Sequence, residues 1–357
     1  MYISDLQLTG FRNYERKEFL FDREKLLTIF VGNNGAGKTN ILEAIYLLGC
    51  ASSFRTTRNE NLIRSAEEFS RVEGKIVSDV DEEHGVEIFF QNNPRKSVFK
   101  WDSVALSAGA LFGRVPVVVF LPEDLALFTD APAKRRRFLD MIFSRVSRKY
   151  FEALTHYQKA LSARNALLIA GKERAVPLEE FTFWEEKLIA YGKFLIEERK
   201  KGIAFFNEIL AKIFNNISKT QSQIGLEYRS SVSALSRYGE LFEERKSFDF
   251  ARLQTSIGPH RDDFSVLLNG KNAITGSSRG EMRTILLALK LAELNFITDV
   301  LHERPIFLLD DVFSELDATH RYGLLERIGV YQTMITTVEP FYFKDFQGNY
   351  RVQAVGN

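Results

Sequence analysis

The sequence is poor in cysteine, in long apolar runs and in net charge. Cys50 is the single cysteine among 357 residues, which excludes a disulfide bond within the chain and fits a reducing compartment. No apolar stretch reaches the ~18 residues that a membrane-spanning helix needs, and the opening residues MYISDLQLTGF lack a signal-peptide pattern. The formal net charge of +1 decides neither for nor against a nucleic-acid partner.

What is present indicates a folded protein with more than one domain, since 45% of the residues are apolar and 27% are charged. Strands are predicted at 2–8, 18–21, 26–31, 74–80, 85–91, 97–104, 115–121, 224–230, 304–311 and 333–338. Helices are predicted at 38–49, 133–170, 178–216, 232–244 and 278–301. This alternation favours an α/β fold with a mostly parallel sheet. Dense charges and helical spacing predict a mainly helical insertion at 131–251 in a discontinuous core of 1–130 and 252–357.

The stretch VGNNGAGKTN (31–40) lies between an apolar run and an apolar helix pattern, and its spacing fits the P-loop G-x-x-x-x-G-K-[ST]. Its glycines let the backbone N–H groups turn inward, and the following helix offers its positive N-terminal end to anions. Lys38 would reach the β- and γ-phosphates, and the Thr39 hydroxyl would bind Mg²⁺. The predicted nucleotide-binding residues here are Gly32, Asn33, Asn34, Gly35, Ala36, Gly37, Lys38, Thr39 and Asn40. The alternative is an ordinary glycine turn.

Two further segments complete the predicted phosphate site. IFLLDDVFSELD (306–317) places Asp310 at a strand tip, where a carboxylate can hold Mg²⁺, and Asp311 can orient or deprotonate the attacking water. The alternative is that the two acids cap a loop. SSRGEMRT (277–284) places Ser278 and Gly280 at a helix start, either as a cap or as an anion site.

In this order, the segments resemble the ATP-binding-cassette (ABC) ATPases. Ser278-Arg279-Gly280-Glu281 is similar to their S-x-G-[QE] signature, and Ser314-Glu315-Leu316-Asp317 is similar to their S-x-L-D segment. The resemblance implies an ABC-type ATPase head that uses ATP and Mg²⁺. It also implies a head-to-tail homodimer that forms when the signature of one subunit binds the γ-phosphate held by the other, and that hydrolysis releases.

Other segments resemble the RecF family of bacterial recombination mediators, which is related to the heads of structural-maintenance-of-chromosomes proteins and Rad50. These segments are LTGFRNY (8–14), RTTRNENLI (55–63), FLPEDLALFTDAPAKRRRFLD (120–140), TSIGPHRDDF (255–264) and LLDDVFSELD (308–317). The resemblance implies binding to duplex DNA and to junctions at single-stranded gaps, and action with RecO and RecR in loading RecA. It also implies DNA-stimulated ATP hydrolysis and a cytoplasmic, nucleoid-associated protein without a membrane partner.

The resemblance assigns roles to single residues. It implies catalytic roles for Lys38, Asp311 and Glu123, and Mg²⁺ binding by Thr39 and Asp310. Further nucleotide contacts are implied for Arg12, Ser278, Arg279, Gly280, Asp317 and Thr337. Asp311 is one methylene shorter than the glutamate common at its position, so slow hydrolysis is expected. The alternative role for Arg12 is an ion pair with an acid instead of a nucleotide contact. At the position where transporter ATPases have a switch histidine, this sequence has threonine.

A basic segment is the expected DNA surface, since residues 131–166 hold nine Lys/Arg and two acids, a local balance of +7. The predicted contacts are Lys134, Arg135, Arg136, Arg137, Arg145, Arg148 and Lys149. Alternatively, these residues form a solvated helix face or ion pairs in the core. The segment GPHRDD (258–263) fits no metal-ligand spacing, so a hydrogen-bonding role is expected for its histidine.

Three other functions fit part of the sequence. A nucleotide-binding subunit of a transporter explains the phosphate site but not the helical insertion. A head of the chromosome-maintenance or Rad50 type needs longer coiled-coil arms than this insertion allows. A non-catalytic scaffold is disfavoured because Lys38, Thr39, Asp310 and Asp311 are all present.

Overall fold

The computed structural model describes residues 1–339, 343 and 348–356. The chain forms two compact units. The first unit comprises Met1–Asp124, Asn216–Lys219 and Leu286–Asn357, and the second comprises Leu125–Asn215 and Thr220–Ile285. Two helices, α6 (Leu178–Ser218) and α9 (Arg279–Leu301), contain residues of both units. No helix in the described part of the chain has the length and apolar character needed to cross a membrane.

An antiparallel sheet of six strands occupies the N-terminal part of the first unit, in the order β2-β1-β4-β5-β6-β7. Its strands are β1 (Tyr2–Phe11), β2 (Tyr14–Leu20), β4 (Phe69–Val77), β5 (Glu83–Gln91), β6 (Lys96–Trp101) and β7 (Val104–Leu106). Buried and more exposed residues alternate along β4 and β5, which is the pattern of a sheet with one face against a core.

A parallel sheet of five strands forms the rest of the first unit, in the order β14-β3-β13-β12-β8. Its strands are β3 (Leu27–Val31), β8 (Val117–Phe120), β12 (Ile306–Asp310), β13 (Thr333–Thr337) and β14 (Tyr350–Ala354). The strands β3, β12 and β13 are almost entirely buried, as expected for strands of a parallel sheet covered on both faces. The mixed antiparallel and parallel sheets confirm the predicted α/β class, but the expectation of a mostly parallel sheet was wrong, since the six-stranded sheet is antiparallel.

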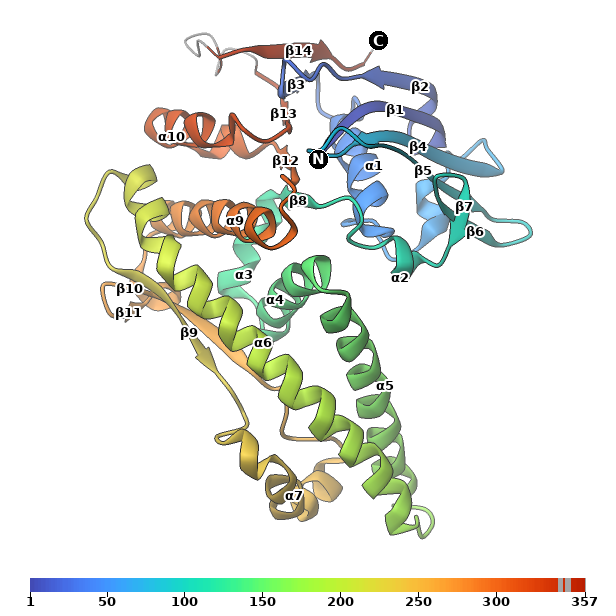
Figure 1. Ribbon diagram of the computed structural model, residues 1–357, viewed down its shortest axis with the longest axis vertical. Helices are drawn as coiled ribbons and strands as arrows, with labels where there is room; N and C mark the ends of the chain where they lie inside the picture. Colours follow the sequence, from blue (N-terminus) through green and yellow to red (C-terminus); the bar gives the residue numbers. More distant parts are fainter. Residues whose placement is uncertain (340–342, 344–347, 357) are drawn as a thin grey trace. The chain divides into compact units, whose positions relative to one another are not determined.

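The helix α1 (Lys38–Cys50) is buried along eleven of its thirteen residues. It contacts strands of both sheets, as Figure 1 also shows, and a helix covered on all sides needs apolar residues all round. The first unit also contains α10 (Ala318–Ile328) and the short elements η1 (Asn59–Leu62), α2 (Ala108–Leu111) and η4 (Val312–Glu315). The turn η2 (Pro122–Leu125) follows β8.

The second unit is mainly helical and carries a small antiparallel sheet in the order β11-β10-β9. Its helices besides α6 and the start of α9 are α3 (Ala126–Thr129), α4 (Pro132–Val146), α5 (Arg148–Ala170), α7 (Tyr238–Arg252) and α8 (Ala273–Gly276), with the turn η3 (Leu235–Arg237). Its strands are β9 (Ile224–Arg229), β10 (Asp263–Leu268) and β11 (Lys271–Asn272). Figure 1 shows α5 and α6 side by side, and the pair Arg164–Glu185, at 2.8 Å, joins them.

The structure differs from the sequence predictions of local structure in several places. The single helix predicted at 133–170 is two helices, because Ser147 leaves the helical conformation and its side chain caps α5 by accepting from Tyr150 N. The helix predicted at 232–244 is α7, which lies further along the chain. The strands β10 and β14 and the helix α10 were not predicted. The strand β10 pairs along its whole length with β9 and thereby joins the second unit, which comprises Leu125–Asn215 and Thr220–Ile285.

Candidate functional site

The phosphate loop (32–37) connects β3 to α1 in the first unit. Gly35 and Gly37 adopt left-handed φ values of 80° and 103°, which glycine alone accepts without strain. Gly37 also lacks room for a side chain, since a Cβ there would lie 2.5 Å from Asn13 Nδ2. Lys38 turns back over the loop, and its Nζ donates to the carbonyl oxygens of Gly32 and Asn33 at 2.6 and 3.0 Å. Burial lowers the pKa of Lys38, against the opposing effect of the two strand-end aspartates.

The first turn of α1 meets the end of β12. Thr39 Oγ1 donates to both carboxylate oxygens of Asp310, at 2.9 and 3.0 Å. Thr336 on β13 donates to Asp310 Oδ1 at 2.7 Å and accepts from the backbone N–H of Asp311 at 2.9 Å. The parallel register of β12 and β13 places Thr336 opposite Asp310. A hydroxyl and a carboxylate are the hard oxygen donors that Mg²⁺ prefers, so Thr39 and Asp310 fit the predicted metal.

A cavity of about 300 Å³, the loop cavity, opens beside these residues. It is lined by Asn34, Gly35, Gly37, Lys38, Thr39, Asn40, Arg55, Asp310, Asp311, Thr336 and Val338. Three of these residues, Arg55, Thr336 and Val338, were not among the predicted site residues. The sequence prediction named Thr337 and not Thr336. Arg55 lies in the segment RTTRNENLI (55–63), which was used only for its resemblance to the RecF family.

Arg55 and Arg12 converge on one buried carboxylate, that of Glu43 on α1. Glu43 is fully buried and accepts from Arg12 Nε and NH2 at 2.8 and 2.6 Å. Arg55 NH1 lies 3.7 Å from the same carboxylate and donates to Asn40 Oδ1 at 2.8 Å. Arg12 therefore pairs with an acid, as the alternative expected, and its contact with a nucleotide stays a prediction. The sequence held one signal for this cluster, which is the position of Glu43 within an otherwise apolar helix pattern. A charged side chain that is buried there needs partners that pair with it.

Glu123, Thr337 and Asp317 are among the predicted residues that do not line the loop cavity. Glu123 is exposed in η2, and its neighbour Asp124 lies 3.4 Å from Lys290 Nζ. Thr337 Oγ1 accepts from the backbone N–H of Glu339 at 3.1 Å, so Thr336 and not Thr337 faces Asp310. Asp317 caps α10 by accepting from the backbone N–H of His320 at 2.9 Å.

The predicted signature lies at the start of α9, in the second unit. Ser278 and Glu281 form a reciprocal cap. Ser278 N donates to Glu281 Oε2 at 2.8 Å, and Glu281 N donates to Ser278 Oγ at 3.2 Å. Ser278, Arg279 and Gly280 are exposed, and a Cβ on Gly280 would meet no atom within 4 Å. The same exposed residues can therefore cap α9 and contact an anion that is not part of this chain. These are the two roles that the sequence suggested for the segment.

The predicted DNA-binding residues divide into two groups. Arg135 is buried and holds Asp263 with two hydrogen bonds of 2.7 and 2.9 Å, and Arg145 is buried as well. Arg136 is half-buried and donates to the carbonyl oxygen of Asp262 at 2.9 Å. For Arg135 the structure shows the alternative, an ion pair in the core, and the DNA contacts of Arg136 and Arg145 stay predictions. The exposed residues are Lys134, Arg137, Arg148 and Lys149.

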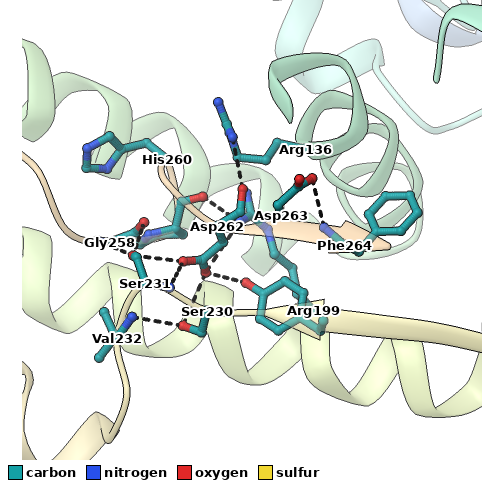
Figure 2. Close-up of polar contacts among 12 residues, drawn as sticks. Arg136, Arg199, Ser230, Ser231, Val232, Gly258, His260, Asp262, Asp263 and Phe264 are labelled. Atoms are coloured by element: carbon teal, nitrogen blue, oxygen red, sulfur yellow. Dashed lines mark hydrogen bonds and ion pairs between the residues drawn. The ribbon is translucent and has the colours of Figure 1, made fainter. Parts of the chain in front are cut away.

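The GPHRDD segment is the centre of a buried polar network in the second unit (Figure 2). Asp262 is fully buried and accepts from the backbone N–H and the hydroxyl of Ser231 at 2.7 and 2.9 Å, and from the hydroxyl of Tyr228. His260 accepts from the Tyr157 hydroxyl at 2.6 Å and donates to the carbonyl oxygen of Thr255 at 3.0 Å. Among the described residues, no group of histidines, cysteines and acids is arranged to hold a metal ion. The segment therefore has a hydrogen-bonding role.

Comparison with known proteins identifies the family. Residues 2–109 match the RecF/RecN/SMC N terminal domain. The DNA replication and repair protein RecF of Agathobacter rectalis is 35% identical over 336 residues, covering 94% of this chain and 92% of that protein. That of Bacillus cereus is 37% identical over 354 residues, with the same coverage of each chain.

Solved structures agree with the sequence relatives. The structure of the recombination mediator protein RecF with ATP, in the RecFOR pathway, matches with a TM-score of 0.90 and 31% identity, covering 99% of this chain and 95% of that one. An Smc head bound to part of ScpA matches with a TM-score of 0.60 and 16% identity, which shows the shared fold. At this identity, and over nearly the whole length of its relatives, the chain belongs to the RecF family.

Proposed function

We propose that the loop cavity binds ATP with Mg²⁺ and that the protein hydrolyses it slowly. The observation that carries this proposal is the contact of Thr39 with Asp310, which joins the end of the phosphate loop to the end of β12. Thr39 and Asp310 would hold the Mg²⁺ ion, which neutralises phosphate charge when bound. Lys38 would exchange its loop carbonyl contacts for phosphate oxygens. A RecF structure with ATP supports the choice of nucleotide.

Asp311 is the proposed residue that orients or deprotonates the attacking water. Its backbone takes a left-handed φ of 50°, and its N–H is fixed by Thr336. Thr336 therefore holds both strand-end aspartates, one through the side chain and one through the backbone. A short aspartate held in this way supports slow hydrolysis, which suits a switch between two states more than a motor.

ATP binding is proposed to drive a head-to-tail homodimer. In that dimer Ser278, Arg279 and Gly280 of one copy would bind the γ-phosphate held by the other copy. Support comes from their exposure at a helix N-terminus, where backbone N–H groups and the helix dipole attract anions. A nucleotide in this cavity would be contacted by both copies, so binding and dimerisation would be linked.

The proposed partner of the dimer is duplex DNA, including the junctions at single-stranded gaps. The exposed Lys134, Arg137, Arg148 and Lys149 would contact phosphates, which gives binding that is independent of sequence and sensitive to salt. The RecFOR pathway named for the solved relative supports action with RecO and RecR, and the loading of RecA on gapped DNA is proposed as the outcome of that action. Membership of the RecF family leaves the transporter and scaffold alternatives without support.

The test measures particle mass by light scattering with and without ATP, together with binding to a labelled duplex. Wild type is expected to dimerise with ATP and then bind DNA more tightly. Lys38→Met and Ser278→Arg are expected to stay monomeric and to bind the duplex weakly. Lys96→Met, at an exposed position on β6, is the matched control and should behave as wild type. A wild type that stays monomeric with ATP, or binds DNA equally without it, contradicts the proposal.

A further inference from the structure

The last described strand, β14, runs parallel to β3, the strand that leads into the phosphate loop. Their register pairs Tyr350 with Leu27 and Ala354 with Val31. Because the two strands run in the same direction, the chain after Ala354 continues beside the loop. The backbone N–H of Val355 donates to the carbonyl oxygen of Val31 at 2.7 Å, at the point where the loop begins.

Val355 and Gly356 touch the loop itself. A Cβ built on Gly32 would lie 2.2 Å from the carbonyl oxygen of Val355, a distance that no side chain tolerates. Gly32 does not share the left-handed φ of Gly35 and Gly37. Space beside Val355, and not backbone conformation, is therefore what the structure requires of Gly32. At Gly356, a Cβ would lie 3.0 Å from Ala36 Cβ, so this residue approaches the other end of the loop.

A second segment, Asn13 in the turn after β1 and Tyr14 at the start of β2, also contacts the loop. Asn13 Nδ2 donates to the carbonyl oxygen of Ala36 at 3.1 Å, and the Tyr14 hydroxyl donates to that of Gly37 at 3.1 Å. Two segments from opposite parts of the chain thus contact the phosphate loop. Asn13 and Tyr14 donate to carbonyl oxygens where the loop enters α1. Val355 packs against Gly32, where the loop leaves β3.

The C-terminal segment is itself anchored away from the loop. Arg351 NH1 donates to the carbonyl oxygen of Leu20 at 2.7 Å, and Asn349 Nδ2 donates to that of Glu24 at 2.9 Å. Val355 is buried. The segment is therefore held in place by contacts outside the loop, and the loop packs against it.

We propose that Val355 and Gly356 are positioning residues for nucleotide binding, which hold the backbone of the phosphate loop in the shape that receives phosphate groups. The inference rests on the proposed ATP site. It predicts that loosening the C-terminal segment weakens nucleotide binding without touching any residue of the loop cavity. It further predicts that the need for glycine at position 32 depends on the Val355 carbonyl.

The first experiment measures the Kd of a fluorescent ATP analogue for four proteins. They are wild type, Gly32→Ala, a chain that ends at Ala354, and the same shortened chain with Gly32→Ala. In the full chain, Gly32→Ala is expected to weaken binding about tenfold, because the new methyl group overlaps the Val355 carbonyl. In the shortened chain the same substitution is expected to change the Kd by less than about threefold, since the overlapping atom is gone.

Gly35→Ala is the matched control. Its φ of 80° makes alanine strained, but its Cβ would meet no atom within 4 Å. Shortening the chain should therefore leave the effect of Gly35→Ala unchanged. An equal loss from Gly32→Ala in both chains would overturn the proposal, because the glycine would then serve the ligand and not the Val355 carbonyl. Should the shortened chain not fold, Val355→Pro, which keeps the carbonyl at position 355 but lacks the N–H that binds Val31, tests the C-terminal segment by hydrogen exchange instead.

A second readout needs no nucleotide. Hydrogen exchange of the backbone amides at 32–37 is expected to become at least about tenfold faster in Val355→Pro than in wild type, while α1 stays protected. Unchanged exchange would overturn the proposal even if ATP binds. If wild type fails to bind ATP but the exchange responds as expected, the proposed function fails and the positioning role of the C-terminal segment stands.

Discussion

Gly280→Ala separates the role of the signature in the dimer from its role in the folded monomer. Gly280 is the second residue of α9, it is exposed, and it does not have a left-handed φ. Its Cβ would meet no atom within 4 Å. Alanine there should stabilise the helix by about 0.5–1 kcal/mol. With an unfolding entropy of roughly 2.1 cal/mol/K per residue over 357 residues, Tm should rise by about 1 °C.

The same methyl group should prevent dimerisation. In the proposed dimer the γ-phosphate of the partner's nucleotide approaches the backbone N–H groups at this helix start, where a Cβ would stand in its way. We expect ATP-dependent dimerisation to weaken at least about tenfold, corresponding to a loss of ~1.4 kcal/mol. Light scattering across a range of protein concentrations with ATP measures dimerisation, and thermal unfolding without ATP measures Tm.

The control is Gly329→Ala, since a Cβ there also meets no atom within 4 Å and its φ of −60° suits alanine. It should dimerise as wild type. If Gly280→Ala has a Tm no lower than wild type and still dimerises normally with ATP, the signature does not bind nucleotide in trans. A large fall in Tm would instead contradict the open surroundings of Gly280.

Three further outcomes are expected. Thr336→Val removes the donor to Asp310 and the acceptor for the Asp311 N–H, so steady-state ATP hydrolysis should fall about tenfold, and an unchanged rate would contradict this role. Burial lowers the pKa of His260 to about 4. The unfolded chain therefore binds a proton that the folded chain does not as pH falls from ~6.5 to ~4, and up to about 3 kcal/mol of stability is lost across that window. Thermal unfolding between pH 4 and 7 should show this loss in wild type but not in His260→Gln. Arg137→Ala should lower the salt slope of duplex binding by about 1 with little change in Tm, whereas Arg135→Ala should destabilise the fold by about 2 kcal/mol because it leaves the Asp263 carboxylate unpaired.

The sequence alone determined the features that depend on short, contiguous patterns. The glycine spacing of residues 32–37, the apolar helix after Lys38 and the apolar strand ending at Asp310 each carry their meaning within about a dozen residues. Backbone conformation and helix formation respond to such local spacing. The α/β class followed from the alternation of these segments, and the structure confirms it.

Residues whose role depends on a distant partner needed the tertiary structure. The register of two parallel strands decides that Thr336, and not Thr337, faces Asp310. Burial of Glu43 decides where the Arg12 guanidinium points, and no local pattern records that pairing.

The C-terminal strand is the clearest case. Its sequence, YRVQA, is short and mostly exposed, so it lacks the strict alternation of buried and exposed residues by which a half-buried strand is recognised. Pairing with β3, more than 300 residues earlier in the chain, makes it a strand and brings Val355 against Gly32. The sequence therefore determined that residue 32 is a glycine within a phosphate loop. Only the packing of the chain's two distant parts decided why glycine is needed there, because a steric limit exists only once both segments are in place.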